Sequence, residues 1–325
     1  MGQRLLPWKW LADAGILLSA ATVTGFLGGW WWVFDLFAHF RVQCFVSLAL
    51  VALVLLAGRR FRPALVFSGF AAANLAVILP FYVGGGADQA GPTTRAVLFN
   101  VNSNLGDPAQ VADLLRGCDA DIVVLEELSA RWTTALRAVL KDYPHATLEA
   151  REDSFGIGLL TRLPVNKAET VYIGPAGVPS FIAELRANDA LITVIATHAL
   201  PPAGPRYARL RDEHLAEIPG LVEEAAGPVL LLGDLNATPW SHAFRRLLRR
   251  SGLRDSMRGH GVQNTWPTGN PLLRIPIDHC LHSDAVEIVD RERGPKAGSD
   301  HFPLIVDFRV HEASTSAKTD AAKGR

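Results

Sequence analysis

Residues 229–236, Val-Leu-Leu-Leu-Gly-Asp-Leu-Asn, constrain the fold more than any other part of this chain. The apolar run is too short for a helix and stops at a glycine, which predicts a buried strand with polar residues at its carboxyl end. Asp234 and Asn236 would then share a face, because alternate strand residues point the same way. A turn explains the stretch equally well in isolation, since Gly, Asp and Asn are common in turns.

Similar ends elsewhere in the chain favour the strand. Short apolar runs lead into Asn100 and Asn102, Glu126 and Glu127, and His198, and the last elements bring Asp278 and then Asp300 and His301. Ligands of α/β proteins usually bind at the carboxyl ends of strands. Carboxylate and amide oxygens are the ligands that Mg²⁺ or Mn²⁺ prefers, and the Cys or paired-His spacing of a zinc site is lacking. The sequence therefore predicts a Mg²⁺ (or Mn²⁺) site.

The order of the expected elements indicates the architecture. Helical patterns cover residues 108–117, 129–140, 206–225 and 240–250. Strand patterns cover 95–102, 121–126, 156–161, 168–173, 180–187 and 190–198, with two or three more between 277 and 309. Helices towards both ends and consecutive strands in the middle predict an α/β fold in which two sheets pack face to face with helices outside.

Three apolar stretches occupy the amino-terminal region, at residues 11–33, 42–57 and 63–83. The first and third are long enough to cross a bilayer, and the second is marginal. We expect three transmembrane helices, and so a multi-pass protein of the cell membrane. A cleaved signal peptide is the alternative for the first stretch, but its charged and Trp-rich flanks and the two later stretches argue against cleavage.

Basic residues predict how these helices are oriented. Arg4 and Lys9 precede the first stretch, and Arg59, Arg60 and Arg62 lie between the second and third. Because cytoplasmic loops are rich in Lys and Arg, the amino terminus should be cytoplasmic and the domain after the third helix extracytoplasmic. The expected organisation is a membrane anchor (1–83), a flexible linker (84–94), a catalytic domain (95–310) and a disordered tail (311–325).

The charge of the presumed catalytic domain limits its partners. Residues 84–310 hold 23 Lys and Arg against 28 Asp and Glu, a formal net charge of −5. Nucleic-acid binders are normally basic where they meet phosphates, so we expect a small-molecule or lipid phosphate rather than a nucleic acid. Cys118 and Cys280 are isolated in the sequence, and we do not expect them to pair.

The ordered motifs Leu-Phe-Asn-Val-Asn, Asp-Ile-Val-Val-Leu-Glu-Glu, Thr-His, Gly-Asp-Leu-Asn-Ala, Ile-Asp-His and Ser-Asp-His resemble those of the endonuclease/exonuclease/phosphatase superfamily. This superfamily includes deoxyribonucleases, inositol-polyphosphate phosphatases and neutral sphingomyelinases. The resemblance covers residues 95–310. It implies a four-layer α/β sandwich of two packed mixed sheets flanked by helices, and a Mg²⁺-dependent phosphoesterase.

The resemblance also implies roles for individual residues. Glu127 corresponds to the metal-binding acid, with Asn102 and Asp300 as further metal contacts, and Glu126 stands where the family often has Gln. Asp234 would orient or deprotonate the attacking water, and His301, oriented by Asp278, would stabilise charge or act as the base. The remaining expected contacts with the phosphate or substrate are His198, Asn236, Asn100, Arg206 and Arg274.

Three functions remain open at this point. The first is a membrane-anchored phosphatase or phosphodiesterase that acts on a phosphorylated substrate outside the cytoplasm. The second is a Mg²⁺-dependent nuclease on the same fold, and the third is a non-catalytic, membrane-anchored binding protein. The three expected helices resemble a membrane-tethered branch of the family that includes a vancomycin/teicoplanin-resistance membrane protein. That likeness makes lipid-linked phosphates candidate substrates.

Overall fold

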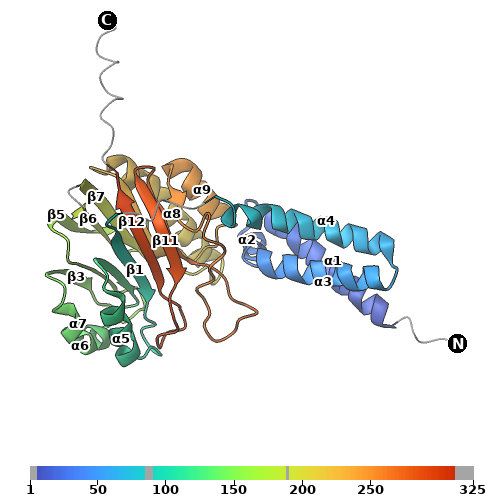
Figure 1. Cartoon of the computed structure of the whole chain (residues 1–325), viewed down its shortest axis with the longest axis horizontal. Helices are drawn as coiled ribbons and strands as arrows, with labels where there is room; N and C mark the ends of the chain where they lie inside the picture. The colour runs from blue at the N-terminus through green and yellow to red at the C-terminus, as the bar shows by residue number, and fades with distance from the viewer. Residues whose placement is uncertain (1–5, 85–90, 188–189, 312–325) are drawn as a thin grey trace, which may run out of the picture.

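The computed structural model describes residues 6–84, 91–187 and 190–311. Most of the expected linker and nearly all of the expected tail lie outside these residues. Within the described chain, an elongated helical bundle projects from one side of an α/β body (Figure 1). The bundle comprises α1 (Leu6–Phe26), α2 (Trp32–Ala38), α3 (Arg41–Ala57) and α4 (Phe61–Ile78), followed by the short 3-10 helix η1 (Leu79–Phe81).

The first apolar stretch does not form the single helix expected over residues 11–33. Helix α1 ends at Phe26, and the chain turns at Gly28 and Gly29 into α2. A Cβ atom at Gly28 would lie 2.7 Å from a carboxylate oxygen of Asp35, and one at Gly29 would lie 2.8 Å from the ring of His242. The turn therefore needs glycine, because the chain here packs tightly against both α2 and the α/β body.

Length and composition support fewer membrane spans than the three expected. Among the described residues, the segment Phe61–Phe81 is long and apolar enough to cross a bilayer. Helices α2 and α3 provide a second candidate if their 61° bend lies within one broken span. Helix α1 has comparable length, but Lys9 and Asp13 lie in its first half.

The α/β body contains two mixed sheets, as the sequence predicts. In both sheets one central pair is parallel, β1 with β2 and β7 with β8, and the other pairs are antiparallel. The first sheet has the order β11 (Val286–Arg293), β12 (Leu304–Val310), β1 (Thr94–Asn100), β2 (Ile122–Glu126), β4 (Ile157–Thr161), β3 (His145–Glu149). The second has the order β5 (Val165–Tyr172), β6 (Pro179–Ala187), β7 (Ala190–Thr197), β8 (Val229–Asp234), β10 (Asp278–His282), β9 (Arg254–Asp255).

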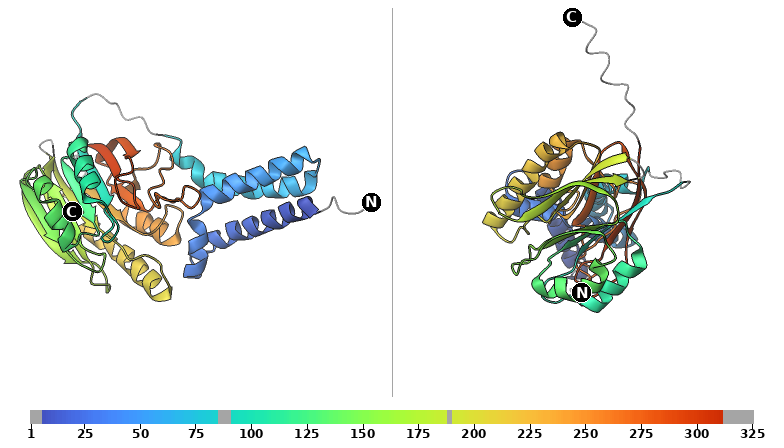
Figure 2. Two further views of the ribbon diagram at one scale, coloured as in Figure 1. Left: turned by 90° about the horizontal axis from the view of Figure 1, so that it is seen from below. Right: turned by 90° about the vertical axis from the view of Figure 1, so that its left-hand side faces the viewer.

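Alternation along the buried strands produces three apolar layers. Leu98 of β1 and Leu232 of β8 point between the sheets, where they belong to one core. Their neighbours Phe99 and Leu231 point outwards to the flanking helices. These helices are α5 (Pro108–Cys118), α6 (Ala130–Ala135) and α7 (Arg137–Leu140) on the first sheet, and α8 (Pro205–Glu224) and α9 (His242–Ser251) on the second. The two sheets and their helices form four layers (Figure 2).

The cysteines are all buried and free. Cys118 belongs to the core between the first sheet and its helices, whereas Cys280 lies between the two sheets. A sheet separates them, so they cannot form a disulfide in this fold.

Candidate active site

The site is built where the two parallel strand pairs end. Asn100 is in register with Glu126 across β1 and β2, and β8 ends at Asp234 directly opposite Asp278 of β10. Because the sheets are stacked, these ends also meet each other. The Glu126 carboxylate accepts a hydrogen bond from the backbone N–H of Asp234, at 3.0 Å, across the interface between the sheets.

Three site residues have left-handed backbone conformations, at the points where the chain leaves its strands. Asn102 has φ 57°, Glu127 φ 60° and Asn236 φ 48°. Asn tolerates this region, but for Glu it costs on the order of 1–3 kcal/mol. The surrounding contacts hold Glu127 in place, since its carboxylate accepts hydrogen bonds from Asn100 Nδ2 at 3.1 Å and from the N–H and hydroxyl of Ser103 at 3.0 and 3.2 Å.

His301 and Asp278 form the pair that the resemblance implies. His301 Nδ1 lies 3.0 Å from Asp278 Oδ2, and Nε2 lies 3.8 Å from Asp234 Oδ2. Burial lowers the pKa of His301, but the charge of Asp278, its hydrogen bond and the charge of Asp234 outweigh burial and raise the pKa to about 9. The ring is therefore cationic at neutral pH.

Two carboxyl groups in the cluster have raised pKa values. Burial, reinforced by the charge of Asp278, raises the pKa of Asp234. Burial, reinforced by the charges of Asp234 and Asp278, raises the pKa of Glu126 well above its usual range. Glu126 is fully buried, and its carboxyl group accepts the hydrogen bond from the Asp234 N–H.

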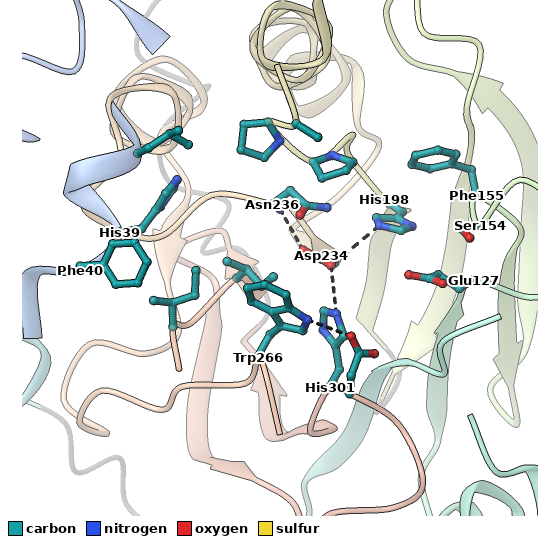
Figure 3. Close-up of a pocket in the computed structure, with 17 residues that line it drawn as sticks. His39, Phe40, Glu127, Ser154, Phe155, His198, Asp234, Asn236, Trp266 and His301 are labelled. Carbon is teal, nitrogen blue, oxygen red and sulfur yellow. Dashed lines mark hydrogen bonds and ion pairs between the residues drawn. The ribbon is translucent and has the colours of Figure 1, made fainter. Parts of the chain in front are cut away.

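His198 is the neutral counterpart of His301. It is buried, with Nε2 3.8 Å from Asp234 Oδ2 and its ring 5.2 Å from that of Phe155. Burial, helped by the charge of His301, lowers the pKa of His198 to about 3. The two histidines flank Asp234 (Figure 3), and their pKa values are shifted in opposite directions.

Of the three expected metal contacts, two line the pocket and the third, Asn102, does not. Glu127 and Asp300 both line the pocket. The side-chain oxygen of Asn102 instead accepts the backbone N–H groups of Asn104 and Leu105, while its Nδ2 donates to Asp300 Oδ1 at 2.7 Å. In this arrangement Asn102 orients Asp300 and does not direct its own oxygen towards the pocket.

The five remaining expected contacts divide into two sets. Asn236 and His198 line the pocket, and Asn100 links Glu127 with Asp234 through Nδ2, at 3.1 and 3.5 Å. Arg206 and Arg274 are not among the lining residues. The Arg274 guanidinium donates to the carbonyl oxygens of Pro267 and Thr268 and lies over the Phe302 ring, so it stabilises its own loop.

The donor set fits a divalent cation. Glu126, Asp234 and Asp278 are almost fully buried, and no Lys or Arg is found among the described residues that line the pocket. Ligand atoms lie within 4.8 Å of one another in two groups that share Asp234, one with Glu126 and His198 and the other with Asp278 and His301. A hard cation coordinated by carboxylate oxygens would offset this concentration of acidic groups.

The pocket has a volume of about 490 Å³, and 11 of its 17 lining residues were not expected from the sequence. Trp266, from the irregular stretch between β9 and β10, donates from Nε1 to Asp300 Oδ2 at 2.9 Å. The additional lining residues are Ser154, Phe155, Pro201, Pro202, Ala203, Ile275 and Ile277, with Leu36, His39 and Phe40 from the helical bundle. The sequence signal that the bundle contributes to the pocket wall was a histidine, His39, between two apolar stretches.

Comparison with solved structures supports the fold. The structures most similar to this chain include an endonuclease/exonuclease/phosphatase from Bacteroides vulgatus, with a TM-score of 0.58 and 19% identity over 68% of this chain and 100% of that one. The human Nocturnin catalytic domain, solved with a bound sulfate anion, has a TM-score of 0.56 and 15% identity over 68% and 96%. Sphingomyelinase C from Streptomyces griseocarneus has a TM-score of 0.51 and 17% identity over 67% and 99%.

Comparison of the sequence with known proteins gives a match to a family profile and none to a curated protein. Residues 97–301 match the profile of the Endonuclease/Exonuclease/phosphatase family, and this range contains the catalytic cluster from Asn100 to His301. This match spans more than half of the chain, so the protein belongs to the endonuclease/exonuclease/phosphatase family.

Proposed function

We propose that this protein is a membrane-anchored, Mg²⁺- or Mn²⁺-dependent phosphoesterase that hydrolyses a phosphorylated, lipid-linked substrate outside the cytoplasm. One observation supports the reaction class above all others. Glu127, His198, Asp234 and the His301–Asp278 pair converge on a single pocket that contains acidic groups, one cationic imidazole and one neutral imidazole. These are the groups that in-line displacement at phosphorus requires.

A divalent cation held by Glu127 and Asp300 would neutralise charge on the phosphate when bound. His301, kept protonated by Asp278, would donate a hydrogen bond from Nε2 to a phosphate oxygen. His198 is neutral and so supplies an uncharged N–H donor. The ionised form of Asp234 is then the group left to accept the proton of the attacking water, because a cationic His301 has no free lone pair on Nε2.

The surface of the bundle supports membrane attachment. Apolar side chains face outwards from all three long helices, with exposed fractions of 71% for Leu17, 62% for Leu53 and 76% for Leu65. Soluble proteins rarely expose such an extended apolar surface. Leu272 and Leu273 are also exposed, and the carbonyl of Arg274 next to them accepts a hydrogen bond from Gln43 of α3, so this loop lies beside the bundle.

A nuclease on the same fold is the alternative, and the pocket does not favour it. A channel for nucleic acid needs cations along the phosphate track. The lining residues of the described chain include neither Lys nor Arg. Helix α9 carries a cluster of four arginines, Arg245, Arg246, Arg249 and Arg250. The first of them, Arg245, lines a second pocket beside the bundle.

Metal removal tests the reaction class. The full-length protein, purified in detergent, should hydrolyse a generic aryl phosphodiester or pyrophosphate with Mg²⁺ or Mn²⁺, and excess EDTA should abolish turnover reversibly. Asp234→Ala should lose at least about a hundredfold in rate while keeping its thermal transition, which is the scale of losing a proton-transfer group. Activity that persists in EDTA would refute the proposal. Efficient cleavage of plasmid DNA would favour the nuclease instead.

A further inference from the structure

The bundle contributes directly to the active-site pocket. Leu36, His39 and Phe40, from the corner where α2 meets α3, line the same pocket as Asp234 and His301. In Figure 3, His39 and Phe40 lie on the far side of the pocket from Glu127 and His198. The site is therefore enclosed by two parts of the chain that are far apart in sequence, and one of them is the anchor.

This corner is held firmly against the α/β body. Asp35 of α2 pairs with the buried Arg211 at 3.2 Å, and its other oxygen accepts the N–H of His242 at 2.6 Å. His39 Nδ1 lies 3.0 Å from the hydroxyl of Thr238 and accepts that residue's backbone N–H at 3.4 Å. Such a set of buried contacts fixes the position of the corner relative to the catalytic groups.

A second set of contacts extends this attachment to the end of α4. Trp240 Nε1 donates to the carbonyl of Val77 at 3.0 Å, and Gly261 N–H donates to the carbonyl of Phe81 at 2.7 Å. Around them lies a small apolar core of Ala38, Ile78, Phe81, Trp240 and Met257. The anchor therefore docks on the body as a rigid element.

The chemistry of the pocket changes from one end to the other. The end at Glu127 and Asp234 is acidic and polar. Phe40 of the anchor lies on the opposite side, and Leu36 and most of the remaining lining residues are also apolar. An apolar wall that runs from a phosphate-cleaving centre to helices with outward-facing leucines would exclude water and accommodate a hydrocarbon chain.

We propose that the α2–α3 corner is the specificity wall of the active site, and that the substrate is a phosphate ester or pyrophosphate whose apolar chain lies against Phe40 and Leu36. This inference rests on the proposed function and names its substrate class. It assigns to the anchor a role in recognition as well as attachment. His39 is the positioning residue of this wall, because its Nδ1 fixes the corner to Thr238.

Phe37 provides a matched control. It lies on the same helix as Leu36, is 41% exposed and is not among the lining residues. Truncation of Phe37 removes the same side chain from α2 as truncation of Phe40 removes from the corner, but leaves the pocket wall intact.

The test compares two substrates with one head group. Wild type, Phe40→Ala, Leu36→Ser and Phe37→Ala, each full length in the same detergent or in nanodiscs, are assayed with hexadecyl pyrophosphate and butyl pyrophosphate. Phe40→Ala and Leu36→Ser should each lower the ratio of kcat/KM for the long chain over the short chain about tenfold, the scale of losing one apolar contact in a pocket. Phe37→Ala should leave the ratio at the wild-type value.

The outcomes separate the inference from the proposed function. If wild type hydrolyses neither pyrophosphate with Mg²⁺ or Mn²⁺, the proposed function fails. If wild type hydrolyses both but the ratio does not change in Phe40→Ala and Leu36→Ser, the specificity wall is refuted and the reaction class stands. Should Phe40→Ala not fold, Phe40→Leu keeps an apolar side chain of smaller size, and an unchanged ratio in Leu36→Ser and Phe40→Leu together refutes the wall.

Discussion

His301 must keep its proton if it is to stabilise negative charge on the phosphate, and Asp278 is the residue that keeps it protonated. The raised pKa of about 9 predicts that kcat/KM falls as pH rises through this value. In Asp278→Asn the negative charge that does most to oppose the effect of burial is lost, so the pKa of His301 should fall. The alkaline limb of the pH profile should then move to lower pH.

The measurement is kcat/KM against pH at saturating metal. Glu213→Gln, on the exposed surface of α8, serves as the control and should leave the profile unchanged. An alkaline limb that stays in place in Asp278→Asn would show that another group titrates there.

The raised pKa of Glu126 predicts that the stability of the folded protein depends on pH. Its pKa is raised in the folded protein, so between its ordinary value of 4.5 and that raised value the folded state binds more protons than the unfolded state. The stabilisation is complete below pH 4.5 and is lost as pH rises. Glu126→Gln keeps an acceptor for the Asp234 N–H and removes the ionisation, so its advantage in Tm over wild type should grow between pH 5 and pH 8.

Thermal unfolding at both pH values checks this, and the expected change is about 2–4 °C for each 1 kcal/mol relieved. Glu127→Gln is the matched control, because it makes the same change in the neighbouring carboxylate, which faces the pocket. This variant should lose activity. An equal Tm difference between Glu126→Gln and wild type at the two pH values would contradict a raised pKa for Glu126.

Short motifs at strand ends were sufficient to predict most of the polar residues that the structure brings together at the candidate site, because their positions follow from local pattern. The Asp278–His301 contact needed the resemblance as well, since 23 residues separate the partners. The hydrogen-bond partners of individual side chains could not be predicted. The oxygen of Asn102 caps its own turn and Arg274 stabilises its own loop, and both depend on neighbours that no spacing rule reveals.

Buried strands were predicted to within a few residues, whereas elements with little apolar signal were missed. Strand β3 is a largely polar edge strand and β9 has only two residues, so neither carries a clear period. The helix expected over 129–140 divides at Leu136 into α6 and α7. Helix α2 was hidden in the connection between two apolar stretches because its packing partners, α8 and α9, come much later in the chain.

The attachment of α2 predicts a large energetic effect at Asp35. Asp35→Ala would leave Arg211 buried beside only Asp212 and the carbonyl of Asn236. Removing one partner of a buried ion pair typically costs about 3–5 kcal/mol. Because Arg211 also contacts Asn236 at the site, activity should fall together with thermal stability.

Glu213→Ala breaks the exposed pair of Glu213 with Arg209 on the same helix, α8, and should cost only about 0.3–0.5 kcal/mol. Thermal unfolding of the full-length variants in nanodiscs measures both effects. Similar costs for the two variants would mean that α2 is only loosely attached.

The arrangement of the whole chain could be anticipated only in part. Two sheets in four layers follow from patterns within the body. The enclosure of the pocket by the helical bundle does not, because it depends on contacts such as His39 with Thr238 that join residues 199 positions apart. Local periodicity carries no information about such a junction, and the resemblance covered only the body.

The position of the basic residues leads to a prediction about membrane topology. The start of α1 and the turn between α3 and α4 lie at the end of the bundle remote from the body (Figure 1). Arg59 and Arg60 in this turn are exposed. At the end near the body, by contrast, Arg41 is buried and donates to the carbonyl of Thr22 and to Asn74 Oδ1. The remote end should therefore be cytoplasmic, and the body extracytoplasmic.

A reporter enzyme that is active only outside the cytoplasm, fused after His311, should be active, and a reporter that requires the cytoplasm should be inactive at the same position. Replacing Arg59, Arg60 and Arg62 by Gln should reduce the first signal and raise the second, because these residues carry most of the charge difference between the two ends. Replacing the exposed Arg246 and Arg249 of α9 by Gln should change neither signal. If, in the unmutated protein, only the reporter that requires the cytoplasm were active, the catalytic domain would lie inside the cell. The search for substrates would then turn to cytoplasmic phosphates.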